Sequence, residues 1–158
     1  PPRSTLFPYT TLFRSKQAAE AGLQDRVLFT GFESDATGIY NAVDIFLLPA
    51  HHDEFAMTVL EAMACERPAV VSGRVGARDM IRHGENGFVV RDSFDEEAFV
   101  ETVDGLVCDE SLRRKTGAIA RESLAACTWD RAGERTLETY REIAAMKAAG
   151  DPIGGNTE

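Results

Sequence analysis

The feature that most constrains the fold is an apolar run at residues 45–48, followed by a polar loop and a second apolar stretch at residues 55–65. The first run, Ile-Phe-Leu-Leu, predicts a strand over residues 44–49 that is buried on both faces. The second predicts a helix that begins near Phe55 and is apolar on nearly every side. Its one carboxylate, Glu61, stands in the middle. Because a lone acid is costly in an apolar core, we expect a polar partner for Glu61.

Short strands and helices alternate along much of the chain. The expected strands, besides residues 44–49, are 27–30, 69–72 and 88–90; the expected helical segments are 37–42, 78–83, 94–107, 111–126 and 130–149. This alternation predicts an α/β fold, a Rossmann-like parallel sheet with helices on both faces. Four strands are fewer than a doubly wound nucleotide-binding domain usually has. We therefore expect the fold to be truncated at its N-terminal strands.

The first residues differ in character from the rest. Residues 1–15 carry two positive charges and no acid, and they resemble a translated sequencing-adapter artefact. We expect this segment to be non-native; a native strand is the alternative. Residues 16–149 are expected to form one domain, whose first helix stops at Gly22. Residues 150–158, rich in glycine and polar groups, are expected to be a flexible tail.

Composition narrows the possible partners and location. The net charge is −9 and the isoelectric point about 4.9, which argues against broad binding to nucleic acid or to an anionic membrane surface. Three widely spaced cysteines are typical of reduced thiols in a cytoplasmic protein rather than of a disulfide framework. No apolar run approaches the length of a transmembrane segment.

The loop after residues 44–49 has the properties of a ligand site. In open α/β sheets, ligands bind at the carboxyl ends of the strands. The first amides of the following helix have no intrahelical partner, and they lie at the positive end of its dipole. A pyrophosphate held there, between the carboxylates of Asp53 and Glu61, matches a nucleoside diphosphate sugar.

Ordinary structural roles are the alternative for both acids. Asp53 could be only a helix N-cap, and Glu61 could be paired with a core arginine such as Arg78. His51, His52 and Asp53 could suggest a metal site, but adjacent histidines in a loop rarely bind one ion together. We expect no metal and no cofactor.

The motifs read as a string resemble a known family. Asp53-x-Phe55 followed by Leu60-Glu61-Ala62-Met63-Ala64-x-x-x-Pro68 is similar to the paired-acid motif of the retaining glycosyltransferases of GT-B fold, family four. The resemblance continues upstream in the Val-Leu-Phe-Thr-Gly-Phe segment at residues 27–32 and in the segment from Tyr to Pro at residues 40–49. It also continues downstream in the Gly-Glu-Asn-Gly-Phe-Val-Val segment at residues 84–90 and in the Thr-Trp pair at residues 128–129. It covers about residues 16–145 and implies a C-terminal, donor-binding domain.

The resemblance implies a role for each motif residue. Asp53 would hold the transferring sugar as the catalytic residue, and Glu61 would bind the ribose. The amides of the helix start would meet the diphosphate or the sugar; these belong to Phe55, Ala56, Met57 and Thr58. The turn formed by Gly31, Phe32 and Glu33 would line the nucleotide base. No metal is required, because amides and basic side chains neutralise the leaving diphosphate.

Four positions depart from the family pattern. Asp53 replaces a glutamate, and Glu54 and Ala56 stand where the family usually has glycines. Glu66 replaces a helix-ending glycine, at a cost of about 1 kcal/mol if the left-handed conformation is kept.

The resemblance also implies what this chain lacks. The family's basic pair and its acceptor domain precede the region seen here. We therefore expect the acceptor to be bound mainly by a missing N-terminal domain, which would also make any peripheral membrane contact. The chain alone would be inactive. The alternatives to a glycosyltransferase are a sugar-nucleotide epimerase of the same fold and a non-catalytic nucleotide-sugar binding module.

Overall fold

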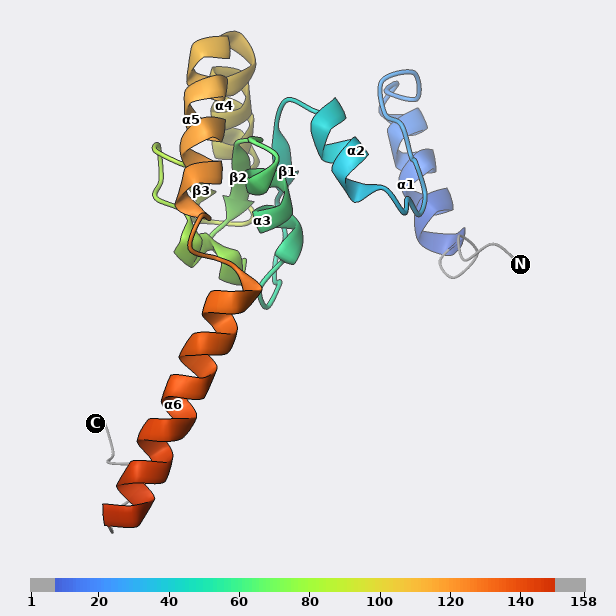
Figure 1. The fold of residues 1–158 in the computed structure, drawn as a ribbon. Coiled ribbons are helices and arrows are strands. Elements are labelled where there is room, and N and C mark those ends of the chain that lie inside the picture. The colour runs from blue at the N-terminus through green and yellow to red at the C-terminus, as the bar shows by residue number, and fades with distance from the viewer. Residues whose placement is uncertain (1–7, 150–158) are drawn as a thin grey trace. The chain divides into compact units, whose positions relative to one another are not determined.

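The computed structural model describes residues 8–149 (Figure 1). They divide into two compact units, with the boundary between residues 39 and 40. The boundary falls inside helix α2 (Ala36–Ala42). The predicted tail, residues 150–158, lies outside the described residues.

The first unit contains one long helix and an irregular segment. Helix α1 (Pro8–Glu20) ends just before Gly22, whose φ of +70° makes it the predicted stop. Residues 8–15 are therefore helical and do not form the strand that was the alternative. The non-native origin of residues 1–15 stays a prediction. The strand predicted at residues 27–30 is wrong, because the segment has no regular structure and Leu28 is 85% exposed. No strand pairs with it among the described residues, and an unpaired segment cannot form a ladder.

The second unit is built on a parallel sheet of three strands in the described residues. The strands are β1 (Phe46–Leu48), β2 (Ala69–Ser72) and β3 (Phe88–Val90), in the order β1-β2-β3. Leu47 pairs with Val70, which pairs in turn with Phe88. The parallel α/β fold is confirmed, with one strand fewer than expected.

Position in the sheet explains how deeply each strand is buried. Every residue of the central strand β2 is buried. In β1, Leu47 is 44% exposed, so the prediction of burial on both faces is wrong for this strand. Among the described residues, β1 pairs only with β2 and forms an edge of the sheet.

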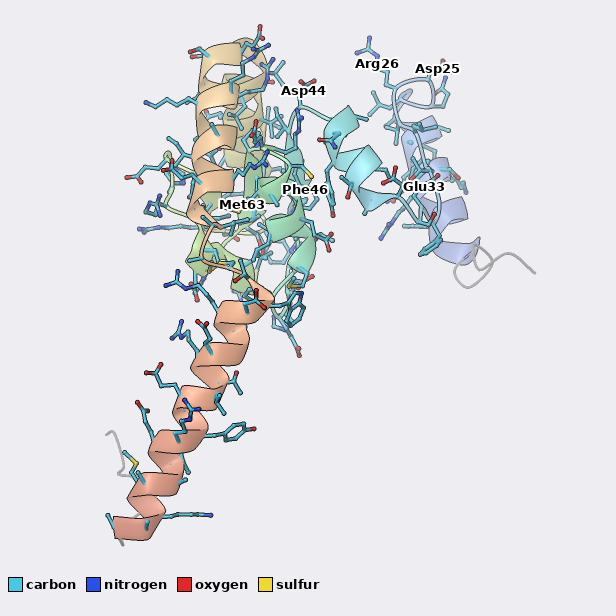
Figure 2. All side chains as sticks on the ribbon, viewed as in Figure 1. Asp25, Arg26, Glu33, Asp44, Phe46 and Met63 are labelled. Atoms are coloured by element: carbon cyan, nitrogen blue, oxygen red, sulfur yellow. The ribbon has the colours of Figure 1, made fainter. Side chains whose placement is uncertain are left out.

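Helices cover both faces of β2. Helix α3 (Met57–Ala64) packs on the face formed by Ala69 and Val71, with Met63 fully buried in that cluster (Figure 2). Helix α4 (Glu96–Cys108) packs on the opposite face, where Phe99 and Leu106 contact Val70. This division follows from strand geometry, in which successive side chains point to opposite faces.

The remaining helices follow the predicted order with shifted ends. Residues 76–80 form a short 3₁₀ helix, η2 (Gly76–Met80), in place of the helical turn predicted at 78–83. Helix α5 (Glu110–Ser123) contacts both α3 and α4, and α6 (Trp129–Ala149) has no buried residue. Asp95 and Asp109 cap α4 and α5 by accepting amide hydrogen bonds of 3.0 and 2.8 Å.

The contact between α3 and α5 depends on a glycine. The carbonyl oxygen of Glu66, just after α3, lies so close to Gly117 of α5 that a Cβ there would overlap it. Gly105, within α4, has nothing within 4 Å of the corresponding position. Two glycines inside helices therefore differ in their surroundings.

We predict opposite effects for alanine at these two positions. Gly117→Ala forces the α3 end and α5 apart, and we expect it to lower the free energy of unfolding by about 1–3 kcal/mol. Gly105→Ala, the matched control, should raise it by about 0.5–1 kcal/mol through the better helix propensity of alanine. Urea denaturation followed by circular dichroism measures both. Equal effects of the two substitutions would contradict the packing described here.

Candidate functional site

The start of α3 presents free backbone amides at the carboxyl end of β1. Ala56 precedes the helix in a left-handed conformation (φ 61°, ψ 73°), and no side chain caps the helix. The helix begins at Met57, two residues later than predicted. The amides of Met57 and Thr58 occupy the first turn, where no intrahelical acceptor exists. Both residues are exposed, so two of the predicted donors are accessible.

Asp53 sits in the loop before this helix and is held by its backbone. Its amide donates to the Arg74 carbonyl (3.3 Å), and its own carbonyl accepts from Gly76 (3.0 Å). Its side-chain Oδ1 accepts from the Phe55 amide at 3.2 Å, so that amide already has a partner. This is an Asx turn, not the helix N-cap of the alternative interpretation. The second oxygen, Oδ2, makes no hydrogen bond within the described residues.

Glu61 does have a polar partner, but it is not an arginine. The Tyr40 hydroxyl donates to Glu61 Oε2 at 2.8 Å. Glu61 is exposed on α3, which corrects the picture of a charge buried in an apolar helix. Arg78 instead bonds the Gly73 carbonyl and lies 3.5 Å from the carboxylate of Asp79. The suggested Glu61–Arg78 pair is therefore wrong.

Burial and the neighbouring carboxylate perturb Tyr40. Desolvation first, and then the hydrogen bond and charge of Glu61, raise the pKa of Tyr40 from 10.0 to about 12. The phenol consequently stays protonated and remains a donor at neutral pH. Glu61 and Tyr40 form a stable acceptor–donor pair there.

A cavity of about 320 Å³ lies beside Asp53, beyond the ends of β1 and β2. Its lining includes the charged side chains of Asp53, Glu54, Arg74, Arg78 and Asp79. Glu61 is not part of it, so the two predicted acids do not line one cavity. Arg74 was not among the site residues predicted from the sequence. The same rule that located the loop after β1 could have found it, because it follows the carboxyl end of β2.

The other predicted residues are placed as follows. Gly31, Phe32 and Glu33 lie in the first unit, where all three are exposed and outside regular structure. Glu33 is labelled in Figure 2. His51 stacks on Phe94 with ring centroids 4.1 Å apart. Within residues 8–149, no group of three or more His, Cys, Asp or Glu residues could hold a metal ion.

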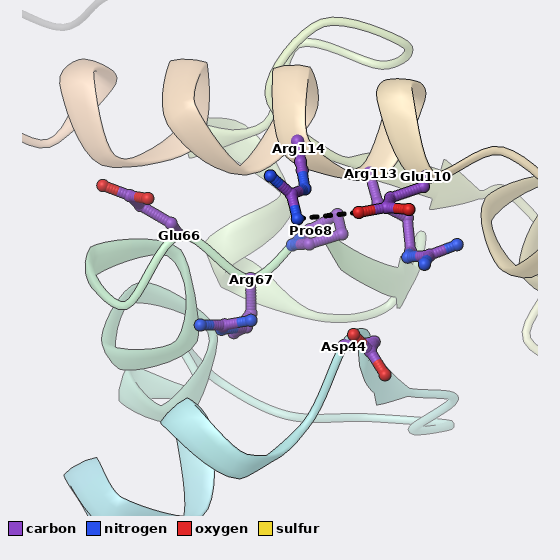
Figure 3. A pocket seen from close by; sticks show the side chains of 7 residues that line it. All are labelled: Asp44, Glu66, Arg67, Pro68, Glu110, Arg113 and Arg114. Atoms are coloured by element: carbon purple, nitrogen blue, oxygen red, sulfur yellow. Dashed lines mark ion pairs between the residues drawn. The ribbon is translucent and has the colours of Figure 1, made fainter.

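A second cavity lies at the opposite, amino edge of the sheet (Figure 3). It measures about 390 Å³, and its lining includes Asp44 and Pro68, which precede β1 and β2. Arg114 pairs with Glu110 across 2.7 Å, and Arg113 donates to two carbonyls at the end of α4. Most of its charged groups thus have protein partners, and the cavity is far along the strands from the loop of Asp53.

These observations define a class of protein. A parallel sheet, free amides at a helix start, and acids and arginines at the carboxyl edge are the features of an α/β domain whose ligand site lies at that edge. In the described part of the chain, no helix is long and apolar enough to cross a membrane.

Comparison with known proteins identifies the family. The family model described as "Glycosyl transferases group 1" matches residues 12–123, and the chain belongs to this family. The lipopolysaccharide core biosynthesis glycosyltransferase LpsE of Rhizobium meliloti is 30% identical over 132 residues, which are 84% of this chain and 38% of LpsE. The chain thus spans well under half of that relative.

Solved structures agree on the fold. The crystal structure of the C-terminal domain of the group 1 glycosyl transferase LpcC from Francisella tularensis is 26% identical, with a TM-score of 0.65 over 80% of this chain and 64% of that one. HepE of Anabaena in complex with UDP is 23% identical, with a TM-score of 0.74 over 85% of this chain and 37% of that one. The predicted C-terminal domain of a GT-B glycosyltransferase is therefore confirmed.

The perturbed tyrosine yields a prediction. Because the pKa of Tyr40 is raised in the folded chain, its stabilising bond to Glu61 is fully present below pH 10 and is lost as the pH rises through about 12. The chain has three tyrosines. Absorbance at 295 nm during alkaline titration should show one phenol ionising late, and Tyr40→Phe should remove that late step. A late step that persists in Tyr40→Phe would contradict the assignment.

Proposed function

We propose that this chain is the donor-binding domain of a glycosyltransferase, which transfers a sugar from a nucleoside diphosphate sugar to a sugar, lipid or small acceptor with retention. One observation carries the proposal: α3 begins without a side-chain cap, at the carboxyl end of β1, with Asp53 before it and Glu61 along it. The likeness in fold to HepE, which was solved with UDP, supports a nucleotide as the ligand.

Each group has a proposed task. The amides of Met57 and Thr58, with that of Ala56, would donate hydrogen bonds to the diphosphate and stabilise the charge that develops as it leaves. Asp53 would hold the transferring sugar through its unbonded oxygen, and Glu61 would accept hydrogen bonds from the ribose hydroxyls. Phe55 would contact the donor through its exposed ring, because its amide already donates a hydrogen bond to Asp53 Oδ1. The base-lining role of Gly31, Phe32 and Glu33, which belong to the first unit, stays a prediction from the family resemblance.

Two arginines lie among the carboxylates at the same edge, and they support a mechanism without a metal. Arg74 and Arg78 line the cavity that also contains Asp53. Arginine forms strong charge-assisted hydrogen bonds with phosphate oxygens. These side chains would assist the helix amides in neutralising the diphosphate.

The three cysteines are free thiols, which supports a cytoplasmic location.

Binding of a nucleotide tests the proposal directly. We expect isothermal titration calorimetry to detect binding of UDP or GDP. Glu61→Ala should weaken it about tenfold or more, because a hydrogen bond to a charged group is lost. The matched control is Glu101→Ala. Glu101 is an exposed residue of α4, and its carboxylate makes no hydrogen bond or ion pair within residues 8–149. Unchanged affinity in Glu61→Ala would show that the ribose role is wrong.

Transfer itself should require more than this chain. It spans 38% of LpsE, and we propose that the acceptor is bound by another domain. The chain incubated with a labelled sugar nucleotide and candidate acceptors should therefore give little or no labelled product. Measurable turnover would contradict this expectation. Epimerised nucleotide without transfer would favour the epimerase alternative instead.

A further inference from the structure

The contact between Tyr40 and Glu61 joins a buried residue to an exposed one. Tyr40 is 8% exposed, whereas Glu61 lies on the accessible side of α3. The hydroxyl of the first donates to Oε2 of the second at 2.8 Å. The two residues are 21 positions apart in sequence. A fixed donor thus reaches out of the core to one oxygen of a carboxylate at the surface.

Packing fixes the position of this donor. The Tyr40 ring meets the Phe46 ring edge-on, with centroids 6.0 Å apart and an angle of 66° between the planes. Phe46 belongs to β1, so the sheet sets where the hydroxyl points. A tyrosine side chain has few rotatable bonds, and a buried one has little freedom left.

The hydrogen bond leaves most of the carboxylate free. An ionised glutamate offers two oxygens with about four lone-pair sites. Tyr40 uses one site on Oε2, and Oε1 has no hydrogen bond within residues 8–149. An exposed glutamate without a partner would sample several rotamers, and ordering it upon binding costs free energy. Tyr40 removes part of that cost before any ligand arrives.

We propose that Tyr40 is a positioning residue, which holds the Glu61 carboxylate ready to accept hydrogen bonds from two neighbouring hydroxyls of a ligand. This inference rests on the proposed function and deepens it by assigning recognition of a vicinal diol, such as that of ribose, to a pair of residues. Tyr40 does not touch the ligand; it acts through Glu61.

The test compares nucleotides with and without the diol. Affinities of the unaltered chain and of Tyr40→Phe are measured by calorimetry for UDP and GDP and for their 2′,3′-dideoxy counterparts. Tyr40→Phe should weaken ribonucleotide binding by about three- to tenfold, the effect of one hydrogen bond, and should leave dideoxynucleotide binding unchanged. In a Glu61→Ala background the same change should have no further effect.

Controls separate positioning from folding. Tyr140→Phe changes an exposed tyrosine of α6 and should alter neither affinity. Because Tyr40→Phe changes a buried side chain, Glu61→Asp provides a second variant, at an exposed position, that keeps the charge but withdraws the carboxylate from the Tyr40 hydroxyl. It should likewise lose preference for the ribonucleotide. Thermal unfolding by circular dichroism confirms that each variant is folded at the temperature of the titration.

Each outcome has a distinct meaning. An equal loss for both kinds of nucleotide would show that Tyr40 has only a structural role and would overturn the inference. So would an unchanged ribonucleotide preference in Tyr40→Phe or in Glu61→Asp. Absence of any UDP or GDP binding by the unaltered chain would contradict the proposed function itself.

Discussion

The candidate site depends on one backbone pairing beyond the end of the sheet. Asp53 and Phe55 exchange hydrogen bonds with the segment after β2, through Arg74, Gly76 and Ala77. The pairing requires Gly76, since a Cβ there would overlap the Glu54 carbonyl. It continues the parallel contact of β1 and β2 past their carboxyl ends. The loop is thereby held at the edge of the sheet, and α3 must begin there with its amides exposed.

Prediction from sequence succeeded where the local pattern determines the structure. The strand at residues 69–72 has the predicted bounds. Glu66, which replaces a helix-ending glycine of the family pattern, keeps the left-handed backbone, with a φ of 61°. It failed where a contact with residues distant in sequence determines the structure. Residues 27–30 have strand-forming side chains but no strand beside them within the described residues. The hydrogen-bond partner of Glu61 was also missed, because Tyr40 belongs to another helix and is 21 positions away in sequence.

Local charge matters more than total charge at this site. The chain carries a net charge of −9, yet the loop edge combines helix amides with Arg74 and Arg78. Electrostatic interactions between exposed charges fade over about 8–10 Å at physiological ionic strength. Groups at contact distance from a ligand therefore dominate over the acidic surface elsewhere. The acidic composition argues against broad polyanion binding but says little about one diphosphate.

Both ends of α3 are delimited by residues in left-handed backbone that are not glycine. Ala56 and Glu66 each have a φ of 61°, a conformation that costs a side chain about 1 kcal/mol. This strain is held by the neighbouring pairing of the loop and by the packing of α5. The helix proposed to bind the donor is thus less stable than it would be with glycine at these two positions. Selection or engineering could recover that stability by changing the two flanking residues, leaving Asp53 and Glu61 unchanged.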